Sequence, residues 1–286
     1  MSNILFFITK RLYAMRKITA LTLLLCCLIV CSCNGQRREG ASTEVVLETT
    51  LGDIRIALFD DTPGHRDNMV QNIRDGKYDG VTFHRVIRNF MIQTGDPDTR
   101  PGCVADTAKP AERIPAEIVY PKYFHKRSFV GAARDGDDEN PERQSDKYQF
   151  YIVTGKTCSD ADLDGHETAR EERDAQLLYD KLCLQHKDEL NAIRAERNPR
   201  KLSDRLEKLL DQARMQVNEN PPLTFTREQR ASYRSQGGAP WLDGEYTVFG
   251  EVVEGMAVVE KIQRLKTNAQ DVPLHEVRIK RAYVVE

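Results

Sequence analysis

The chain has 286 residues, of which 40% are hydrophobic, so it is long enough to bury a core in one large domain or two smaller ones. Its 42 basic and 44 acidic residues give a formal net charge of -2. Because the two signs are mixed along the chain, this composition provides no overall attraction to nucleic acid, which is excluded as a leading partner.

The N-terminal segment has the features of a secretory signal. Arg16 and Lys17 precede an uncharged apolar stretch over residues 18–30, which is shorter than the roughly 20 residues that a membrane-spanning helix needs. We therefore predict a signal peptide over residues 1–32. Since Met15 begins a compact signal by itself, translation is expected to start there.

Four cysteines lie in or just after the apolar stretch, and the last of them, Cys33, follows a small residue. This arrangement resembles the lipobox of bacterial lipoproteins and predicts a lipid on Cys33, with residues 33–43 as a flexible tether. The expected location is the cell envelope, anchored by the lipid and facing the periplasm. The alternative is a plain cleaved signal and a soluble periplasmic or secreted protein. The remaining cysteines have neither disulfide nor metal-site spacing.

A β-hairpin is predicted at the start of the folded part, because apolar residues alternate over 45–47 and 54–58 around the turn at Leu51-Gly52. A short helix follows from Pro63 to about Asp75. Further strands are expected at 81–87, 148–153, 247–252 and 277–285, and a second helix at 256–266. This pattern favours a mainly β, antiparallel architecture.

Residues 158–238 differ from the rest of the chain, because they are strongly charged and follow helical periodicity. One long helix is predicted over 167–197, and the Asn198-Pro199 pair ends it. A second helix is predicted over 202–217, and the capping-box pair Thr226 and Gln229 predicts the start of a third, short helix. The simplest arrangement is an antiparallel helical hairpin inserted into the β domain.

The most informative stretch is FHRVIRNFMIQTGDP at residues 83–97. It resembles the signature of the cyclophilins, a family of peptidyl-prolyl cis/trans isomerases. Three more blocks match in the same order: GAAR at 131–134, QFYI at 149–152 and WLDGEYTVFG at 241–250. The resemblance implies a closed eight-stranded antiparallel barrel capped by two helices. It divides the chain into barrel segments at residues 44–156 and 240–286, separated by the helical insertion at 157–239.

The resemblance also assigns the site. Arg85 matches the catalytic arginine, whose guanidinium polarises the prolyl nitrogen as the X-Pro bond twists. The substrate-binding positions matched in this chain are Phe90, Met91, Gln93, Ala133, Arg134, Gln149, Tyr151, Trp241, Leu242 and Tyr246. The implied substrates are proline-containing polypeptides, in particular exported or unfolded proteins. Neither a cofactor nor a metal is expected.

The chain departs from the family pattern at three points near this site. Tyr151 stands where phenylalanine is common, which is expected to add a hydroxyl to the pocket rim, and Tyr246 stands where many members have histidine. The Gly131-Ala132 pair replaces a more usual serine and methionine. His84 is expected to be structural, because alternation along a strand turns it away from the side of Arg85.

Two functions remain open from the sequence. The first is an isomerase that acts on X-Pro bonds. The second is a proline-peptide-binding chaperone or scaffold module, in which the helical insertion makes the useful contacts and isomerisation is incidental. For the insertion itself, a solvated helical decoration and a docking site for a protein partner are about equally favoured.

Overall fold

The computed structural model describes residues 41–103, 111–222 and 224–285, which form one compact unit. The predicted signal peptide, Cys33 and nearly all of the predicted tether lie outside the described residues. Among the described residues, no helix is long and apolar enough to cross a membrane.

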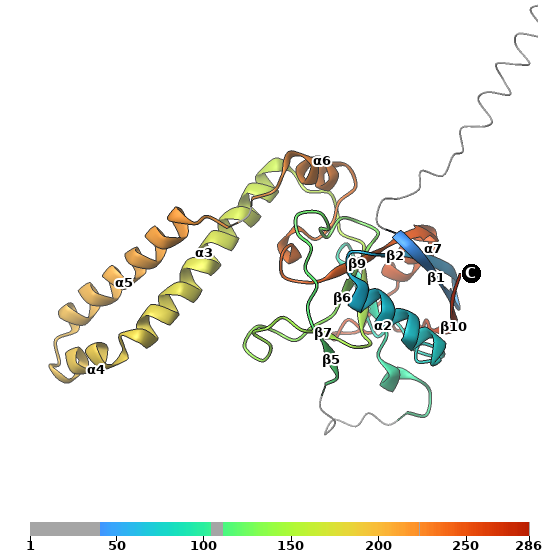
Figure 1. Ribbon diagram of the computed structural model, residues 1–286, viewed down its shortest axis with the longest axis horizontal. Helices are drawn as coiled ribbons and strands as arrows, with labels where there is room; N and C mark the ends of the chain where they lie inside the picture. Colours follow the sequence, from blue (N-terminus) through green and yellow to red (C-terminus); the bar gives the residue numbers. More distant parts are fainter. Residues whose placement is uncertain (1–40, 104–110, 223, 286) are drawn as a thin grey trace, which may run out of the picture. The chain divides into compact units, whose positions relative to one another are not determined.

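An antiparallel sheet of eight strands forms the centre of this unit (Figure 1). The strands, in their order across the sheet, are β10 (Ile279–Val284), β1 (Ala41–Thr49), β2 (Gly52–Phe59), β9 (Val248–Glu254), β6 (Phe129–Ala132), β8 (Phe150–Val153), β4 (Met91–Thr94) and β3 (Arg85–Ile87). A separate pair, β5 (Arg113–Ile114) and β7 (Ser145–Asp146), lies beside it.

The predicted hairpin is confirmed as β1 and β2, whose register pairs Thr49 with Gly52 around the turn. Gly52 has a φ of 128°, a value that residues with a Cβ atom avoid, so glycine suits this turn. The predicted strand over 81–87 is shorter than expected. Only its last three residues form β3. The carbonyl of Val81 accepts a hydrogen bond from Ile279 at the start of β10, and the N–H of Phe83 donates to Val277, two residues earlier.

The expected closed barrel is not found, because no continuous ladder of hydrogen bonds joins the first and last strands of the described sheet. Within the described residues, the sheet is curled but open, with β3 and β10 as its two edges. A single bridge between Thr82 and Arg278 and a few backbone hydrogen bonds join the edges. The chain leaves the strand conformation just before Arg85, so the ladder cannot extend across this seam.

The main core lies between the inner face of the sheet and two helices, α2 (Pro63–Arg74) and α7 (Met256–Gln263). Met69 and Ile73 come from α2, and Val259 and Ile262 come from α7; all four side chains are almost fully buried. The helix expected from Pro63 therefore has the predicted start, with Pro63 in its first turn and Gly76 beyond its end at a φ of 64°.

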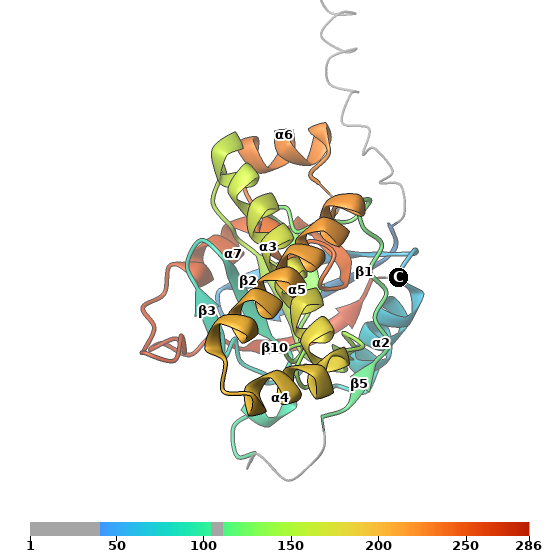
Figure 2. The ribbon, with the colours of Figure 1, turned by 90° about the vertical axis from the view of Figure 1, so that its left-hand side faces the viewer.

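The helical segment between β8 and β9 contains α3 (Asp160–Gln185), α4 (Lys187–Ala195), α5 (Pro199–Glu219) and α6 (Arg227–Ser235). Helices α3 and α5 lie side by side, and α4 closes their far end (Figures 1 and 2). Their small core consists of Leu182, Leu190, Leu209 and Ala213.

The first helix of this segment differs from the prediction at both ends. It begins at Asp160, because Ser159 and Asp162 form a capping box that was overlooked in the sequence. It ends at His186, where the chain turns so that Leu182 and Leu190 both reach the same small core. The predicted cap at Thr226 and Gln229 is confirmed as the start of α6.

Candidate active site

The site is built on the outer face of strands β3, β4, β8 and β6. The register places Arg85 opposite Gln93, Gln93 opposite Tyr151, and Tyr151 opposite Gly131, so these four residues form one row across the sheet. The adjacent row consists of Val86, Ile92, Ile152 and Val130, all of which lie in the main core. Because side chains alternate between the faces of a sheet, the Arg85 row faces outward.

A pocket of about 130 Å³ lies over this row. Its lining residues are Arg85, Phe90, Met91, Gln93, Ala133, Arg134, Tyr151, Leu242 and Tyr246. All nine belong to the predicted site, whose residues come from four separate sequence blocks. Met91, Tyr151 and Leu242 pack against one another as the buried apolar part.

The guanidinium of Arg85 stands at the rim of this pocket. Its side chain is 47% exposed, and its Nε lies 3.9 Å from the carboxylate of Asp271, which is 42% exposed. An exposed ion pair at this distance contributes little, because water screens both charges. The guanidinium is therefore held loosely and can turn toward a ligand in the pocket.

The two predicted positions outside the pocket lining lie directly beside it. The amide of Gln149 accepts a hydrogen bond from Gln93 Nε2 at 2.9 Å, which fixes the orientation of Gln93. Trp241 is 41% exposed, and its ring lies 5.1 Å from that of Phe90. The structure thus brings all the predicted site residues into one region.

The pocket floor rests on a buried polar network. Nε2 of His125 lies 2.9 Å from the hydroxyl of Tyr151, and Nδ1 lies 3.0 Å from Asp243. The same carboxylate accepts hydrogen bonds from the backbone N–H of His125 at 2.8 Å and from the hydroxyl of Tyr233 at 2.7 Å. Burial raises the pKa of Tyr151 well above its usual value, so the phenol stays neutral and hydrogen-bonded.

The predicted position of the Tyr151 hydroxyl is therefore wrong. It was expected at the pocket rim, but it lies beneath the floor, where His125 is its partner. His125 was not among the predicted site residues, because its neighbours in the chain do not resemble any catalytic motif. Asp243 lies within the matched block at residues 241–250, but the sequence does not indicate that its carboxylate hydrogen-bonds to His125.

Strand alternation does not explain the orientation of the His84 side chain, because His84 lies outside β3, which begins only at Arg85. The preceding residue, Phe83, is the one that enters the core. Burial lowers the pKa of His84, and the nearby Asp96 carboxylate and Gln149 side chain offset this only in part. His84 therefore lies near the Gln149 end of the groove as a neutral imidazole at neutral pH.

A profile of the family "Cyclophilin type peptidyl-prolyl cis-trans isomerase/CLD" matches residues 44–169 and 215–284. The chain belongs to this family. It contains the residue blocks and the outer-face pocket described above, and its enzyme class is that of the peptidyl-prolyl cis-trans isomerases.

Curated relatives agree with this assignment. A protein of Staphylococcus haemolyticus named as a peptidyl-prolyl cis-trans isomerase is 27% identical over 241 residues, covering 82% of this chain and 88% of its own length. A similarly named protein of Staphylococcus epidermidis is 28% identical over 248 residues, covering 85% of this chain and 92% of its own. The crystal structure of a cyclophilin type isomerase of Cryptosporidium parvum matches with a TM-score of 0.50 and 18% identity, covering 85% of this chain and 98% of that one.

The family profile leaves residues 170–214 unmatched. This gap contains most of α3, all of α4 and most of α5, while α6 falls within the matched part. Among the described residues, no three side chains of His, Cys, Asp or Glu gather closely enough to hold a metal ion.

Proposed function

We propose that this cyclophilin-type isomerase accelerates rotation about X-Pro bonds in polypeptides, with Arg85 polarising the prolyl nitrogen. The observation that carries the proposal is the loosely held guanidinium at the rim of a pocket with an apolar floor. The pocket would hold the proline ring, and the carbonyl before it would rotate in the open groove.

The reaction needs neither a nucleophile nor a proton transfer. Amide resonance opposes rotation with a barrier of about 18–20 kcal/mol. When the bond twists, the prolyl nitrogen becomes pyramidal and gains a lone pair, which a cationic donor stabilises. The contact with Arg85 is therefore stronger in the transition state than in the ground state, which is the condition for catalysis.

The dimensions of the pocket suit one small ring. An apolar cavity of about 150 Å³ can hold a benzene molecule, and this pocket has about 130 Å³. Met91, Tyr151 and Leu242 supply the apolar contact surface. Gln93, fixed by Gln149, offers its remaining amide groups to the substrate backbone.

Replacing Arg85 tests the mechanism. We expect Arg85→Ala to reduce kcat on a proline tetrapeptide by about 10²–10³-fold, as removal of one transition-state donor does in other enzymes. Arg85→Lys keeps the charge but loses the fork of donors, so it should recover little activity. Arg88→Ala, a neighbouring exposed arginine, is the matched control and should resemble the wild type.

The same variant separates the two functions that the sequence leaves open. If Arg85→Ala keeps full turnover in an NMR exchange assay, the proposed mechanism is wrong. If it loses turnover but still suppresses aggregation of an unfolded, proline-rich protein, the binding-module function gains support instead.

We further propose that the protein acts on exported or unfolded chains at the cell envelope, anchored by a lipid on Cys33 and facing the periplasm. The charged and apolar pattern of residues 16–33 supports this. Cys31 is the competing site, but it follows the bulky Val30 and fits the lipobox pattern less well. Metabolic labelling with a fatty acid should mark the wild type and Cys31→Ser but not Cys33→Ser. Equal labelling of both variants would contradict the choice of Cys33.

Helices α3 to α5 are, in this proposal, an insertion into the cyclophilin domain that binds a protein partner. The gap in the family match at residues 170–214 supports the first part. Exposed apolar side chains on these helices, namely Leu177, Leu184 and Met215, are compatible with the second.

A further inference from the structure

One wall of the pocket is not part of any strand. Residues 240–246 form a 3-10 turn, η2 (Pro240–Leu242), followed by a loop that enters β9 only at Val248. This wall carries Leu242 and Tyr246, which line the pocket, and Trp241 beside it. Because no strand ladder holds residues 240–246, their position depends on the side chains that anchor them.

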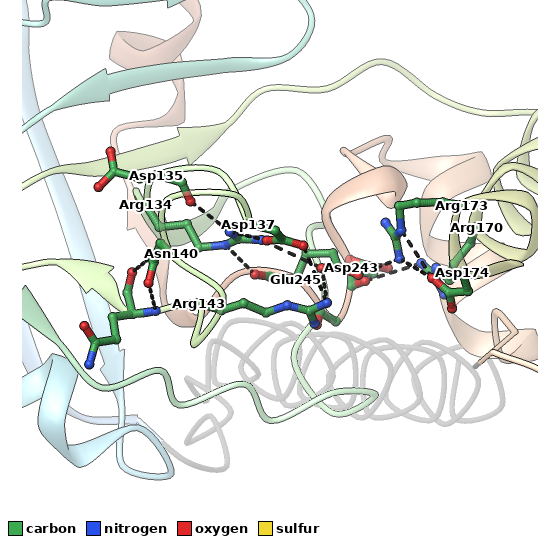
Figure 3. Close-up of polar contacts among 12 residues, drawn as sticks. Arg134, Asp135, Asp137, Asn140, Arg143, Arg170, Arg173, Asp174, Asp243 and Glu245 are labelled. Atoms are coloured by element: carbon green, nitrogen blue, oxygen red, sulfur yellow. Dashed lines mark hydrogen bonds and ion pairs between the residues drawn. The ribbon is translucent and has the colours of Figure 1, made fainter. Parts of the chain in front are cut away.

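Helix α3 supplies two of these anchors (Figure 3). Arg170 is only 9% exposed. Its guanidinium donates to the carbonyl oxygens of Pro240 and Asp243, at 3.5 and 3.4 Å. One turn further along, Arg173 donates to the carboxylate of Glu245 at 2.8 Å. A ring contact between His166 and Trp241, at 5.6 Å, adds to the same contact surface.

Glu245 connects Arg173 to the opposite side of the pocket. Its side chain is 11% exposed, and the carboxylate also pairs with Arg143 at 2.9 Å and with Arg134 at 3.7 Å. Arg134 donates in addition to the backbone carbonyl of Glu245 at 2.9 Å, and its guanidinium lies 4.5 Å from the ring centre of Tyr246. Hydrogen bonds between charged groups are about twice as strong as neutral ones, so Glu245 fixes the wall firmly.

We propose that Arg173, supported by Arg170, is a positioning residue of the active site: it anchors the pocket wall at residues 240–246 through Glu245. The inference rests on the proposed function of the pocket. Arg170 and Arg173 lie in the stretch that the family profile leaves unmatched. The helical segment therefore supplies part of the support for the proline pocket, in addition to any contact with partners.

A graded series at residue 173 tests this role. Arg173→Ala should raise KM for a proline tetrapeptide by about three- to tenfold while kcat stays within about twofold, because the wall is displaced but Arg85 is untouched. Arg173→Lys keeps the charge and should stay within about threefold of wild-type KM. Arg173→Glu places a second carboxylate beside Glu245 and should raise KM most.

Trp241 provides a second readout that does not depend on turnover. It is the single tryptophan of the chain and lies on the proposed wall. In Arg173→Ala, the indole ring of Trp241 should be more accessible to acrylamide, so acrylamide should quench its fluorescence more strongly. The matched control is Arg205→Ala, which removes another arginine–carboxylate pair in the same helical segment, with Glu189 at 2.7 Å, away from the wall. This control should leave KM and quenching unchanged.

The outcomes distinguish this inference from the proposed function. If Arg85→Ala is inactive but the residue-173 series and Arg205→Ala all match the wild type in KM and quenching, the positioning role is wrong and the isomerase mechanism stands. If Arg85→Ala is fully active, the mechanism fails whatever the series shows. An equal rise in KM for Arg173→Ala and Arg205→Ala would mean a general loosening of the helices and would also overturn the inference.

Discussion

The phenol ring of Tyr151 occupies the space that Gly131 leaves open on the neighbouring strand. The two residues are paired in the β6–β8 register. A Cβ atom at residue 131 would lie 2.7 Å from Cε2 of the ring and closer still to Cζ and the hydroxyl, which no packed side chain tolerates. Glycine at residue 131 and tyrosine at residue 151 are therefore packed together: the ring and hydroxyl of Tyr151 need the space that a side chain at residue 131 would fill.

Gly131→Ser should disrupt the pocket floor. The new side chain has to push the Tyr151 ring aside, so we expect kcat/KM on a proline tetrapeptide to fall by about tenfold or more. Adding Tyr151→Leu removes the hydroxyl and the ring atoms Cζ and Cε2 that overlap the new side chain, and it should restore part of the activity. If the double variant is no better than Gly131→Ser alone, the two positions are not coupled through this contact.

Tyr151→Phe alone should lower stability with little loss of turnover. It leaves Nε2 of His125 buried without its partner at 2.9 Å, and an unsatisfied buried polar group costs about 1–3 kcal/mol. Urea unfolding at neutral pH measures the change. Tyr246→Phe, at the half-buried neighbouring tyrosine, is the control, and an equal loss in both variants would contradict the role of the Tyr151 hydroxyl.

The residues that line the site were predicted more completely than the residues that hold them in place. Pocket residues such as Arg85, Met91 and Leu242 lie in contiguous blocks that resemble the cyclophilin motifs, and this resemblance implied their roles. His125 and Arg173 could not be found in this way, because their roles come from contacts with residues 118 and 72 positions away in the chain. The departures at Gly131 and Tyr151 were visible in the sequence, but their coupling depends on strand register.

Helical periodicity predicted that residues 158–238 are helical but misplaced the ends of the first helix. The break at His186 has no proline or glycine to mark it; it follows from the way Leu182 and Leu190 both pack into one small core. Likewise, the strand predicted over 81–87 is interrupted before Arg85 by the seam between the sheet edges. Both differences are tertiary effects on local patterns that were correctly recognised.

Stability should decrease in mild acid because of His65. Its imidazole is buried between Glu117, at 2.6 Å from Nδ1, and Ser145, at 2.9 Å from Nε2. Burial lowers the pKa of His65 from its usual 6.5, and Glu117 offsets this only in part. The unfolded chain therefore takes up the proton first, so the stabilisation is complete above pH 6.5 and declines as the pH falls below it.

Urea unfolding from pH 8 to pH 5 would measure this decline. His65→Gln should flatten the pH dependence, whereas His275→Gln, at an exposed histidine, should leave it unchanged. A pH dependence that is the same in the wild type and in His65→Gln would rule out His65 as its source.

The rate of isomerisation should be nearly constant between about pH 6.5 and pH 8. Arginine side chains in proteins are not deprotonated in this range, and the lowered pKa of His84 keeps that imidazole neutral. The measurement is kcat/KM for a proline tetrapeptide across this pH range at one fixed temperature. A steep profile that disappears in His84→Gln would instead give His84 a part in catalysis.

The small core of the helical segment should be separable from the main core of the sheet in unfolding experiments. Leu209 is fully buried, and Leu209→Ala should cost about 2–5 kcal/mol of the stability of α3 to α5. Leu184→Ala, at a side chain that is 71% exposed, should change stability by less than about 0.5 kcal/mol. Hydrogen exchange along α3 and α5 gives the readout; similar effects of both variants would contradict the assigned packing.

The two ends of the helical segment differ in how much sequence change the catalytic groove tolerates there. Near the groove, a deletion that removes Arg170, Arg173 or Tyr233 also removes a support of the wall that carries Leu242. At the far end, α4 packs on α3 and α5, its neighbours in the same segment. The turn at Arg197 and Asn198 is therefore a suitable place to attach a fluorophore or a fused domain while the catalytic groove stays unchanged.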